Sequence, residues 1–245
     1  MTTVPDARTD WQRWHDEREA TAIDPHGPAA LIGTHWLDDQ PLAVEATDST
    51  WVDAEGVAVG TGSHGRIELA PGHQHRIGNL LLHAIVRAGK VALRVFDPDA
   101  STRTDLRGID VFDHDPALVL TGTVDLGAGG LRLEHIDGFR SDNVGATVHL
   151  TIGTEAVALR GVVNPDGGVQ ITFADTTNGQ ETQRFRFLTL PAPDEEGRVT
   201  VDFNRAYLPP CTFSDHFLCP LPPQDNRLNV AIRAGESRLR RTDAR

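Results

Sequence analysis

Apolar and polar residues alternate in short segments over most of the chain, from Leu42 onward. Alternation with a period of two places every second side chain on one face, as in a half-buried β-strand. Gly, Pro, Asp or Asn residues lie between many of these segments and favour turns. We therefore expect a mainly β protein, with strands that include residues 57–59, 67–69, 91–95, 169–173, 199–203 and 228–232.

The N-terminal segment has a different pattern, which predicts a short helix. Trp11 and Trp14 are three positions apart on one helical face, and charged residues fill the remaining positions. Thr9 and Gln12 have the spacing of a capping box, and Pro25 disfavours helical geometry before it. We expect this helix to pack on a sheet. The apolar stretch 28–37 that follows fits either a helix or a strand.

A weak internal repeat in the sequence suggests two related antiparallel β units, each a sandwich or barrel-like sheet. Residues 89–97 and 167–175 share the spacing of a Gly, three apolar residues and an Asp. Duplication of one β unit would explain this repeat. The alternative is coincidence, because strands that enter Asp-rich turns look alike over a few positions. The expected segments are a helical segment (1–41), β units (42–126 and 144–236), a Gly-rich linker or hairpin (127–143) and a solvated basic tail (237–245).

The run from Val201 to Glu236 concentrates the residue types that carry chemistry. It contains both Cys residues, the one Tyr, and several Asp, Asn, Arg and Pro residues. Long Pro-rich loops are uncommon inside compact domains and are often functional. We therefore expect any functional site to involve this long C-terminal loop.

Five contiguous motifs lie in and around this loop: Asp202–Tyr207 (DFNRAY), Pro209–Phe213 (PPCTF), Cys219–Pro223 (CPLPP), Asn226–Leu228 (NRL) and Ala234–Glu236 (AGE). Together they resemble the signature of the DUF1684 family of bacterial and archaeal proteins. A looser likeness runs through residues 33–37, 94–97, 107–112 and 175–179. The resemblance implies kinship and no particular substrate. Three positions depart from the family pattern: Asn178 replaces a Ser, Gln183 a Tyr and Leu208 an Asn.

The candidate site residues are polar groups of this loop and the turn before it. Asp202 and Asn204 are two apart and share a face if the strand continues. For a small polar or anionic molecule we expect ligand contacts from Asn204, Arg205, Tyr207, Asn226 and Arg227. Asp202 or Asp175 would be the general base and His216 the proton carrier, without a cofactor. The alternative is an internal network in which Asp202 pairs with Arg205 or Arg227 and Asn226 caps loop carbonyls.

Metal and nucleotide motifs are weak. Cys211, His216 and Cys219 do not have the paired spacing of a zinc site, so packing is favoured over a metal or thiol-redox role. His73 and His75 share a face but lack a recognisable third ligand, so we expect no metal site. Residues 60–65 have the GxGxxG spacing, but a strand pattern follows, which predicts a hairpin turn rather than a dinucleotide site.

The charge and the hydrophobicity of the sequence indicate which kinds of partner to expect. The 245 residues carry a net charge of −12, which disfavours nucleic acid, and no apolar run is long enough to span a membrane. With no signal-peptide pattern, we expect a cytoplasmic protein. The functions that stay open are a small-molecule enzyme, a non-catalytic ligand- or protein-binding module, and a metal or thiol protein. Homo-oligomerisation is also open.

Overall fold

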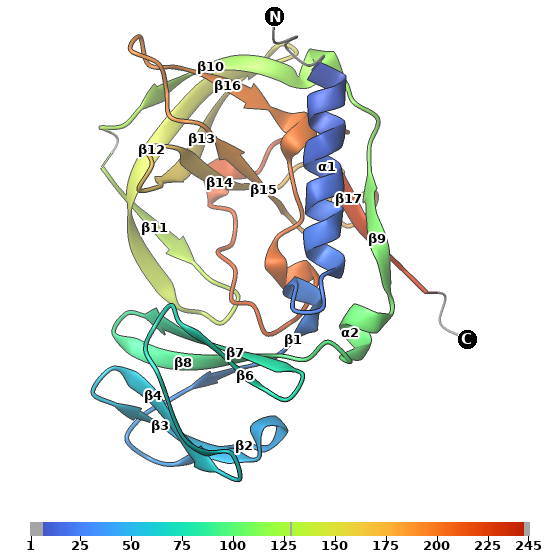
Figure 1. Cartoon of the computed structure of the whole chain (residues 1–245). Helices are drawn as coiled ribbons and strands as arrows, with labels where there is room; N and C mark the ends of the chain where they lie inside the picture. The colour runs from blue at the N-terminus through green and yellow to red at the C-terminus, as the bar shows by residue number, and fades with distance from the viewer. Residues whose placement is uncertain (1–6, 128, 243–245) are drawn as a thin grey trace, which may run out of the picture. The chain divides into compact units, whose positions relative to one another are not determined.

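Figure 1 shows the computed structural model, which describes residues 7–127 and 129–242. The protein is mainly β, its sheets are antiparallel and a helix stands near its N-terminus, which confirms the expected fold class. The described chain divides into two compact units. The first unit contains the described residues up to Glu19, Arg107–Thr212 and Leu218–Arg240; the second contains Ala20–Leu106, Phe213–Phe217 and the described residues from Arg241 onward.

The second unit contains two four-stranded antiparallel sheets, ordered β1-β8-β7-β6 and β2-β3-β4-β5. Its strands are β1 (Leu31–Trp36), β2 (Leu42–Val44), β3 (Ser49–Ala54), β4 (Val57–Gly62), β5 (Gly65–Leu69), β6 (Gln74–Ile77), β7 (Leu80–Arg87) and β8 (Lys90–Phe96). Short 3₁₀ helices Pro28–Ala30 and Glu45–Thr47 and the helix α2 (Ser101–Thr104) complete it.

Both sheets of this unit contribute to one hydrophobic core around Trp51. Trp51 is fully buried and donates its indole N–H to the Thr47 hydroxyl at 2.9 Å. Gly60 lies against the ring, where a Cβ atom would come within 2.7 Å of it. Gly62 and Gly65 are paired across the β4–β5 hairpin, which confirms the turn expected at 60–65.

The first unit is built on a strongly curved seven-stranded sheet, ordered β15-β14-β13-β12-β10-β16 with β11 beside β12 (Figure 1). Its strands are β9 (Leu106–Val111), β10 (Val119–Asp125), β11 (Gly130–Glu134), β12 (Arg140–Ile152), β13 (Glu155–Val163), β14 (Val169–Phe173), β15 (Arg186–Leu190), β16 (Arg198–Asp202) and β17 (Glu236–Arg241). Short 3₁₀ helices are Pro116–Leu118, Phe203–Arg205, Pro210–Thr212 and Gln224–Asn226. The rings of Phe173 and Phe203 pack edge to face in its core, with their centroids 5.7 Å apart.

The N-terminal helix α1 (Ala7–Ile23) packs on the first unit through its residues up to Glu19. The Trp11 indole N–H donates to the Asn204 carbonyl at 2.9 Å, and the Glu19 carboxylate accepts from the Ile109 N–H at 3.0 Å. Thr9 lies inside the helix, so it is not the cap that its spacing suggested. The apolar stretch after the helix forms a 3₁₀ turn and then strand β1.

The unit boundaries differ from the expected division. β10 pairs with β12 and β16, so it belongs to the first unit rather than to the segment 42–126. The Gly-rich stretch contains the β11–β12 hairpin. Residues 236–241 form β17, which pairs with β9, so backbone hydrogen bonds order most of the expected tail. Residues 243–245 of that tail lie outside the described residues.

The loop from Phe203 to Gly235 contains three 3₁₀ helices and no strand. The strand expected at 228–232 is therefore wrong. The Leu228 N–H donates to the Ala174 carbonyl, and the Ile232 N–H donates to the Asp175 carboxylate. Isolated bonds to a turn replace the continuous ladder that the alternating pattern suggested.

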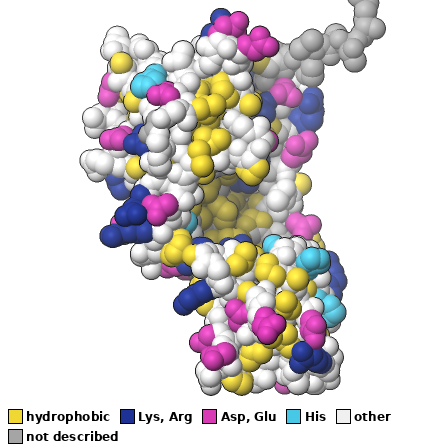
Figure 2. Space-filling view, turned by 90° about the vertical axis from the view of Figure 1, so that its left-hand side faces the viewer, with side chains coloured by type: hydrophobic (Ala, Val, Ile, Leu, Met, Phe, Trp, Pro, Cys, Tyr) yellow, Lys and Arg dark blue, Asp and Glu magenta, His cyan; other side chains and the backbone are white. Residues whose placement is uncertain are grey.

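Charged side chains of both signs are interspersed on the face of the molecule shown in Figure 2. Within the described part of the chain, no helix has the length and apolar character needed to cross a membrane.

Candidate functional site

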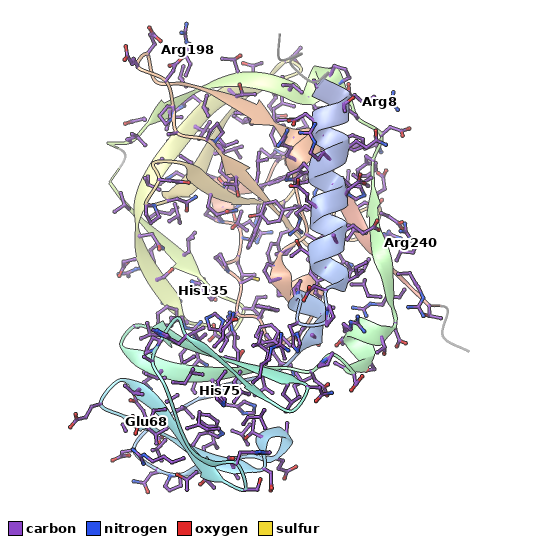
Figure 3. The ribbon with its side chains drawn as sticks, in the orientation of Figure 1. Arg8, Glu68, His75, His135, Arg198 and Arg240 are labelled. Atoms are coloured by element: carbon purple, nitrogen blue, oxygen red, sulfur yellow. The ribbon has the colours of Figure 1, made fainter. Side chains whose placement is uncertain are left out.

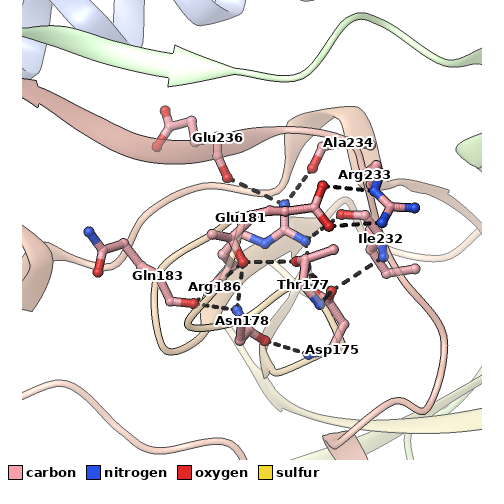
Figure 4. Close-up of polar contacts among 11 residues, drawn as sticks. Asp175, Thr177, Asn178, Glu181, Gln183, Arg186, Ile232, Arg233, Ala234 and Glu236 are labelled. Atoms are coloured by element: carbon pink, nitrogen blue, oxygen red, sulfur yellow. Dashed lines mark hydrogen bonds and ion pairs between the residues drawn. The ribbon is translucent and has the colours of Figure 1, made fainter.

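Asp175, an expected general base, forms a buried ion pair with Arg186. Arg186 Nη2 lies 2.7 Å from Asp175 Oδ2, and both side chains are fully buried. Asp175 Oδ1 accepts hydrogen bonds from the Thr177 N–H and hydroxyl at 2.8 and 2.6 Å. Figure 4 shows the guanidinium also donating to the carbonyls of Ile232 and Ala234. Both oxygens of Asp175 are thus engaged within the protein, and the pair fastens the long loop to the sheet.

Sequence reasoning missed Arg186, although the sequence contains a signal for it. Arg186, Leu188 and Leu190 alternate on the same face of β15 and are all buried. An arginine at an inward position requires buried acceptors. Burial lowers the pKa of Arg186, while the Asp175 carboxylate opposes that shift. The guanidinium remains charged at neutral pH because arginine starts from a very high pKa.

The turn after Asp175 is closed by Asn178, one of the departures from the family pattern. Asn178 Oδ1 accepts from the Asp175 N–H at 2.5 Å, and Nδ2 donates to the Thr182 hydroxyl and the Gln183 carbonyl (Figure 4). The Gln183 N–H in turn donates to the Ser237 carbonyl at 3.1 Å. These contacts are what a turn needs to satisfy its backbone.

Asp202 and Asn204 lie together, but strand β16 ends at Asp202 and their polar groups bind the protein itself. Asp202 Oδ1 accepts from the N–H and Nδ2 of Asn204 at 3.0 and 2.9 Å. The fully buried Asn204 carboxamide accepts from the Asp115 N–H at 2.8 Å and donates to the Asp115 carbonyl at 2.9 Å. Arg205 forms ion pairs with Asp10 and, at 3.5 Å, with Asp202. This arrangement matches the internal-network interpretation.

Both the hydroxyl and the ring of Tyr207 contact other side chains of the protein. The hydroxyl donates to Gln170 Oε1 at 3.1 Å, and the Arg18 guanidinium lies 4.7 Å from the ring centroid. Arg18 Nε is held 2.8 Å from Glu236, whose side chain is fully buried. Glu236 also accepts from the Leu208 N–H at 2.7 Å. Arg18 therefore joins helix α1 to the start of β17 by an ion pair and to the loop through the Tyr207 ring, and sequence reasoning identified neither contact.

His216 lies in the second unit, whereas Asp175 and Asp202 lie in the first. Its side chain is exposed, and its carbonyl accepts from the Thr34 hydroxyl at 2.9 Å. No hydrogen bond or ion pair among the described residues links any two of the three expected catalytic groups.

Cys211 and Cys219 lie close together but form no disulfide bond. The Cys211 N–H donates to Cys219 Sγ at 3.3 Å. A hydrogen bond with Cys219, together with burial, raises the pKa of the Cys211 thiol. A thiol held in the protonated state is a poor nucleophile and a poor metal ligand.

His73 and His75 are exposed, and Figure 3 shows His75 in the second unit. No group of three or more His, Cys, Asp or Glu side chains within the described ranges has the geometry to hold a metal ion.

Asn226 bridges two strands of the first unit where their direct pairing ends. Strands β13 and β14 pair from Val163 and Val169 only as far as Gly161 and Ile171. At the next position, Asn226 Oδ1 accepts from the Arg160 N–H and Nδ2 donates to the carbonyls of Arg160 and Thr172, each at 2.7 Å. The carboxamide thus substitutes for a peptide group between the strands. It also fixes Arg160 relative to the neighbouring Arg227.

Arg160 and Arg227 line one open depression of about 450 Å³ on the first unit, together with Thr147, Glu155, Ala156, Val157, Ala158, Asp225 and Leu228. The only Arg160 side-chain hydrogen bond recorded among the described residues is a 3.4 Å contact to the Gly130 carbonyl. Its Nε is buried without a partner in that part of the chain. Arg227 is exposed, and none of the described residues forms an ion pair or hydrogen bond with its guanidinium. Of the expected ligand contacts, Arg227 is the one whose polar group is unoccupied.

Comparison with known proteins agrees with the signature in the loop. Residues 104–237 match the family model described as "Protein of unknown function (DUF1684)". The chain belongs to the DUF1684 family. It is similar to an uncharacterized protein of Haloarcula marismortui solved by NMR in solution, with 33% identity over 58% of this chain and 80% of that chain and a TM-score of 0.46. No curated protein matches the chain.

In this DUF1684 protein the signature residues fasten the loop to the sheet. Gly235 has φ of +74°, and a Cβ atom there would lie 2.3 Å from the Ala206 carbonyl oxygen, so the close approach requires glycine. Ala234 accepts from Arg186, and Glu236 holds the Leu208 N–H. The family resemblance therefore rests largely on residues that fold the loop.

Proposed function

We propose that this protein binds a small anionic molecule in the depression lined by Arg160 and Arg227. The observation that carries the proposal is that two guanidinium groups share one open depression without a carboxylate partner among the described residues. Several other exposed arginines of the described chain are paired with a carboxylate, for example Arg132 with Asp142 at 2.8 Å. Two cations in one place, neither with an ion-pair partner in the described part of the chain, favour an exogenous anion, which would share the depression with Glu155 and Asp225.

The chemistry of the depression supports a carboxylate or a phosphate as the ligand. Guanidinium groups present planar donors that match these anions in bidentate geometry. The exposed Arg227 guanidinium lacks an acceptor among the described residues, which an anion oxygen would supply. Because Asn226 holds the backbone of Arg160 through two hydrogen bonds of 2.7 Å and that of Thr172 through a third, part of the site is organised before the ligand arrives.

The proposal is one of binding. Asp175 and Asp202 are engaged in internal contacts, and His216 belongs to the other unit. We assign no acid or base step to them at this depression.

Thermal unfolding with inorganic phosphate or citrate as probe tests the proposal. A ligand at about a hundred times its Kd adds about 2.7 kcal/mol of stability. At 2–4 °C per kcal/mol this raises Tm by roughly 5–10 °C. Arg160→Gln and Arg227→Gln should each reduce the rise, and the double variant should abolish the specific part of it.

The matched control is Arg132→Gln, which removes an exposed arginine from the same unit but from outside the depression. Phosphate also stabilises proteins in general, because it is excluded from their surfaces. The decisive quantity is thus the difference between the control and the double variant. Equal Tm rises in these two proteins for both probes would overturn the proposal.

A further inference from the structure

The hairpin of β11 and β12 brings His135 and Ser141 together in the first unit. His135 Nε2 lies 2.9 Å from Ser141 Oγ, and His135 Nδ1 lies 2.9 Å from the Leu218 carbonyl oxygen. Asn143 Nδ2 lies 2.9 Å from the same Ser141 Oγ. Figure 3 places His135 at the end of β11. Neither residue belongs to the anion-binding depression.

The hydrogen-bond partners determine which nitrogen of neutral His135 carries the proton. A carbonyl oxygen can only accept, so Nδ1 must be the donor to Leu218. Nε2 is then the unprotonated nitrogen and accepts from the Ser141 hydroxyl. The Asn143 amide donates to the same oxygen. Ser141 therefore directs its proton at a free imidazole nitrogen, as the nucleophile of an acyl-transfer enzyme does.

The position of these side chains is unusual for the hairpin. Ser141 is paired with Leu133 and Asn143 with Leu131, and both leucines are buried. Side chains opposite each other in an antiparallel pair share a face. Polar side chains thus occupy positions beside a buried apolar stripe. Ser141 and His135 are nonetheless half-buried rather than sealed, so a reagent can reach them.

We propose that Ser141 and His135 form a catalytic dyad that hydrolyses a small ester. This goes beyond the proposed anion binding and does not depend on it. The Leu218 carbonyl takes the role of the residue that orients the histidine in a triad. Asn143 donates to Ser141 Oγ at 2.9 Å and so helps to fix the orientation of the hydroxyl.

The chemical steps balance without a cofactor. Ser141 Oγ attacks the ester carbonyl carbon while its proton moves to His135 Nε2. The tetrahedral intermediate collapses, the C–O bond to the alcohol breaks, and the alcohol leaves with the proton from Nε2. Water then attacks the acyl-serine and gives a proton to Nε2. Collapse releases the carboxylic acid and returns the proton to Ser141, so one ester and one water yield one acid and one alcohol.

A fluorophosphonate probe tests the dyad on the full-length protein, because such probes phosphonylate activated serines. We expect one adduct per chain, mapped by mass spectrometry to Ser141 and absent from Ser141→Ala. His135→Gln keeps a polar side chain but cannot accept the proton, so labelling and hydrolysis of p-nitrophenyl acetate should fall about 10²–10⁴-fold. The control is His149→Gln, which removes an exposed histidine of the same strand β12 and should leave labelling unchanged.

Labelling at Ser141 that requires His135 supports the dyad. No adduct at Ser141 in the folded wild-type protein, or equal labelling in wild type and His135→Gln, would overturn it and leave the contact as a purely structural hydrogen bond. If His135→Gln does not fold, His135→Asn takes its place, because it also keeps a polar side chain that cannot take up the proton. The same loss of labelling is expected, and labelling equal to that of wild type contradicts the proposal.

Discussion

The side-chain amide of Asn226 binds both backbone groups of Arg160, accepting from its N–H and donating to its carbonyl at 2.7 Å each. Asn204 makes the same kind of pair with Asp115 at 2.8 and 2.9 Å. In both cases the carboxamide of a buried asparagine forms the pair of hydrogen bonds that a peptide group would form. Two residues that looked like ligand contacts in the sequence instead fasten the loop to its neighbours.

Replacing Asn226 with alanine should destabilise the first unit. The buried carbonyl of Thr172 and both backbone groups of Arg160 would lose their partner. With about 1–3 kcal/mol for each of the three groups left unsatisfied, we expect a loss of at least about 3 kcal/mol in the free energy of unfolding. Urea unfolding measures it. Asn79→Ala, at an exposed position, should stay within about 0.5 kcal/mol of wild type. Equal stability of the two variants would show that water replaces the amide.

The buried and exposed ion pairs near Asp175 should respond very differently to neutralisation. Asp175→Asn leaves the fully buried Arg186 without its carboxylate, and breaking such a pair costs about 3–5 kcal/mol. Glu181→Gln removes the partner of Arg233 in the same turn (Figure 4), where the pair is largely solvent-exposed. That change should cost far less, because water solvates both groups of an exposed pair and salt screens their attraction. Denaturant unfolding of both variants distinguishes them, and comparable losses would contradict the structural role of Asp175.

Cys211 should be slow to alkylate in the folded protein. Its hydrogen bond with Cys219 and its burial raise its pKa, so little thiolate is present near neutral pH. We expect iodoacetamide to modify Cys211 at least about tenfold faster in urea than in buffer, since each unit of pKa changes the thiolate fraction about tenfold. Mass spectrometry of the alkylated peptide gives the rate. Rapid modification of the native protein would restore the thiol-redox hypothesis.

Acidification should destabilise the second unit through His35 and His83. Burial and His216 lower the pKa of His35, and burial and Arg94 lower the pKa of His83, from an ordinary value of 6.5. As the pH falls through 6.5, the unfolded chain takes up these protons before the folded protein does. The stabilisation is thus present above this pH and is lost below it.

The free energy of unfolding, measured in urea at pH 7.5 and 5.5, checks this pH dependence. The double variant His35→Gln/His83→Gln should lose less stability between the two pH values than wild type does. His75→Gln, which removes an exposed histidine of the same unit, is the control and should behave like wild type. A pH dependence that is unchanged in the double variant would assign the effect to other groups.

Much of the architecture could be predicted from local pattern. Period-two alternation identified β4, β5, β8 and β14, and the spacing of Trp11 and Trp14 identified α1. These signals are local because side-chain direction repeats with the backbone geometry of a strand or helix. The pattern failed at 228–232, where a turn supplies the hydrogen bonds that a neighbouring strand would have supplied. The family could also be identified, because the motifs of its signature are contiguous.

The partners of the polar residues were decided only by the tertiary structure. Arg186 meets the carbonyls of Ile232 and Ala234, and His135 meets the carbonyl of Leu218, across long stretches of chain. Hydrogen bonds between residues so far apart in the sequence depend on strand register and on the path of a loop, and neither is encoded in the spacing of a short motif. The sequence thus determined the strands, the helix and the family. Tertiary contacts decided which polar groups form internal hydrogen bonds that hold the loop and which stay available to a ligand.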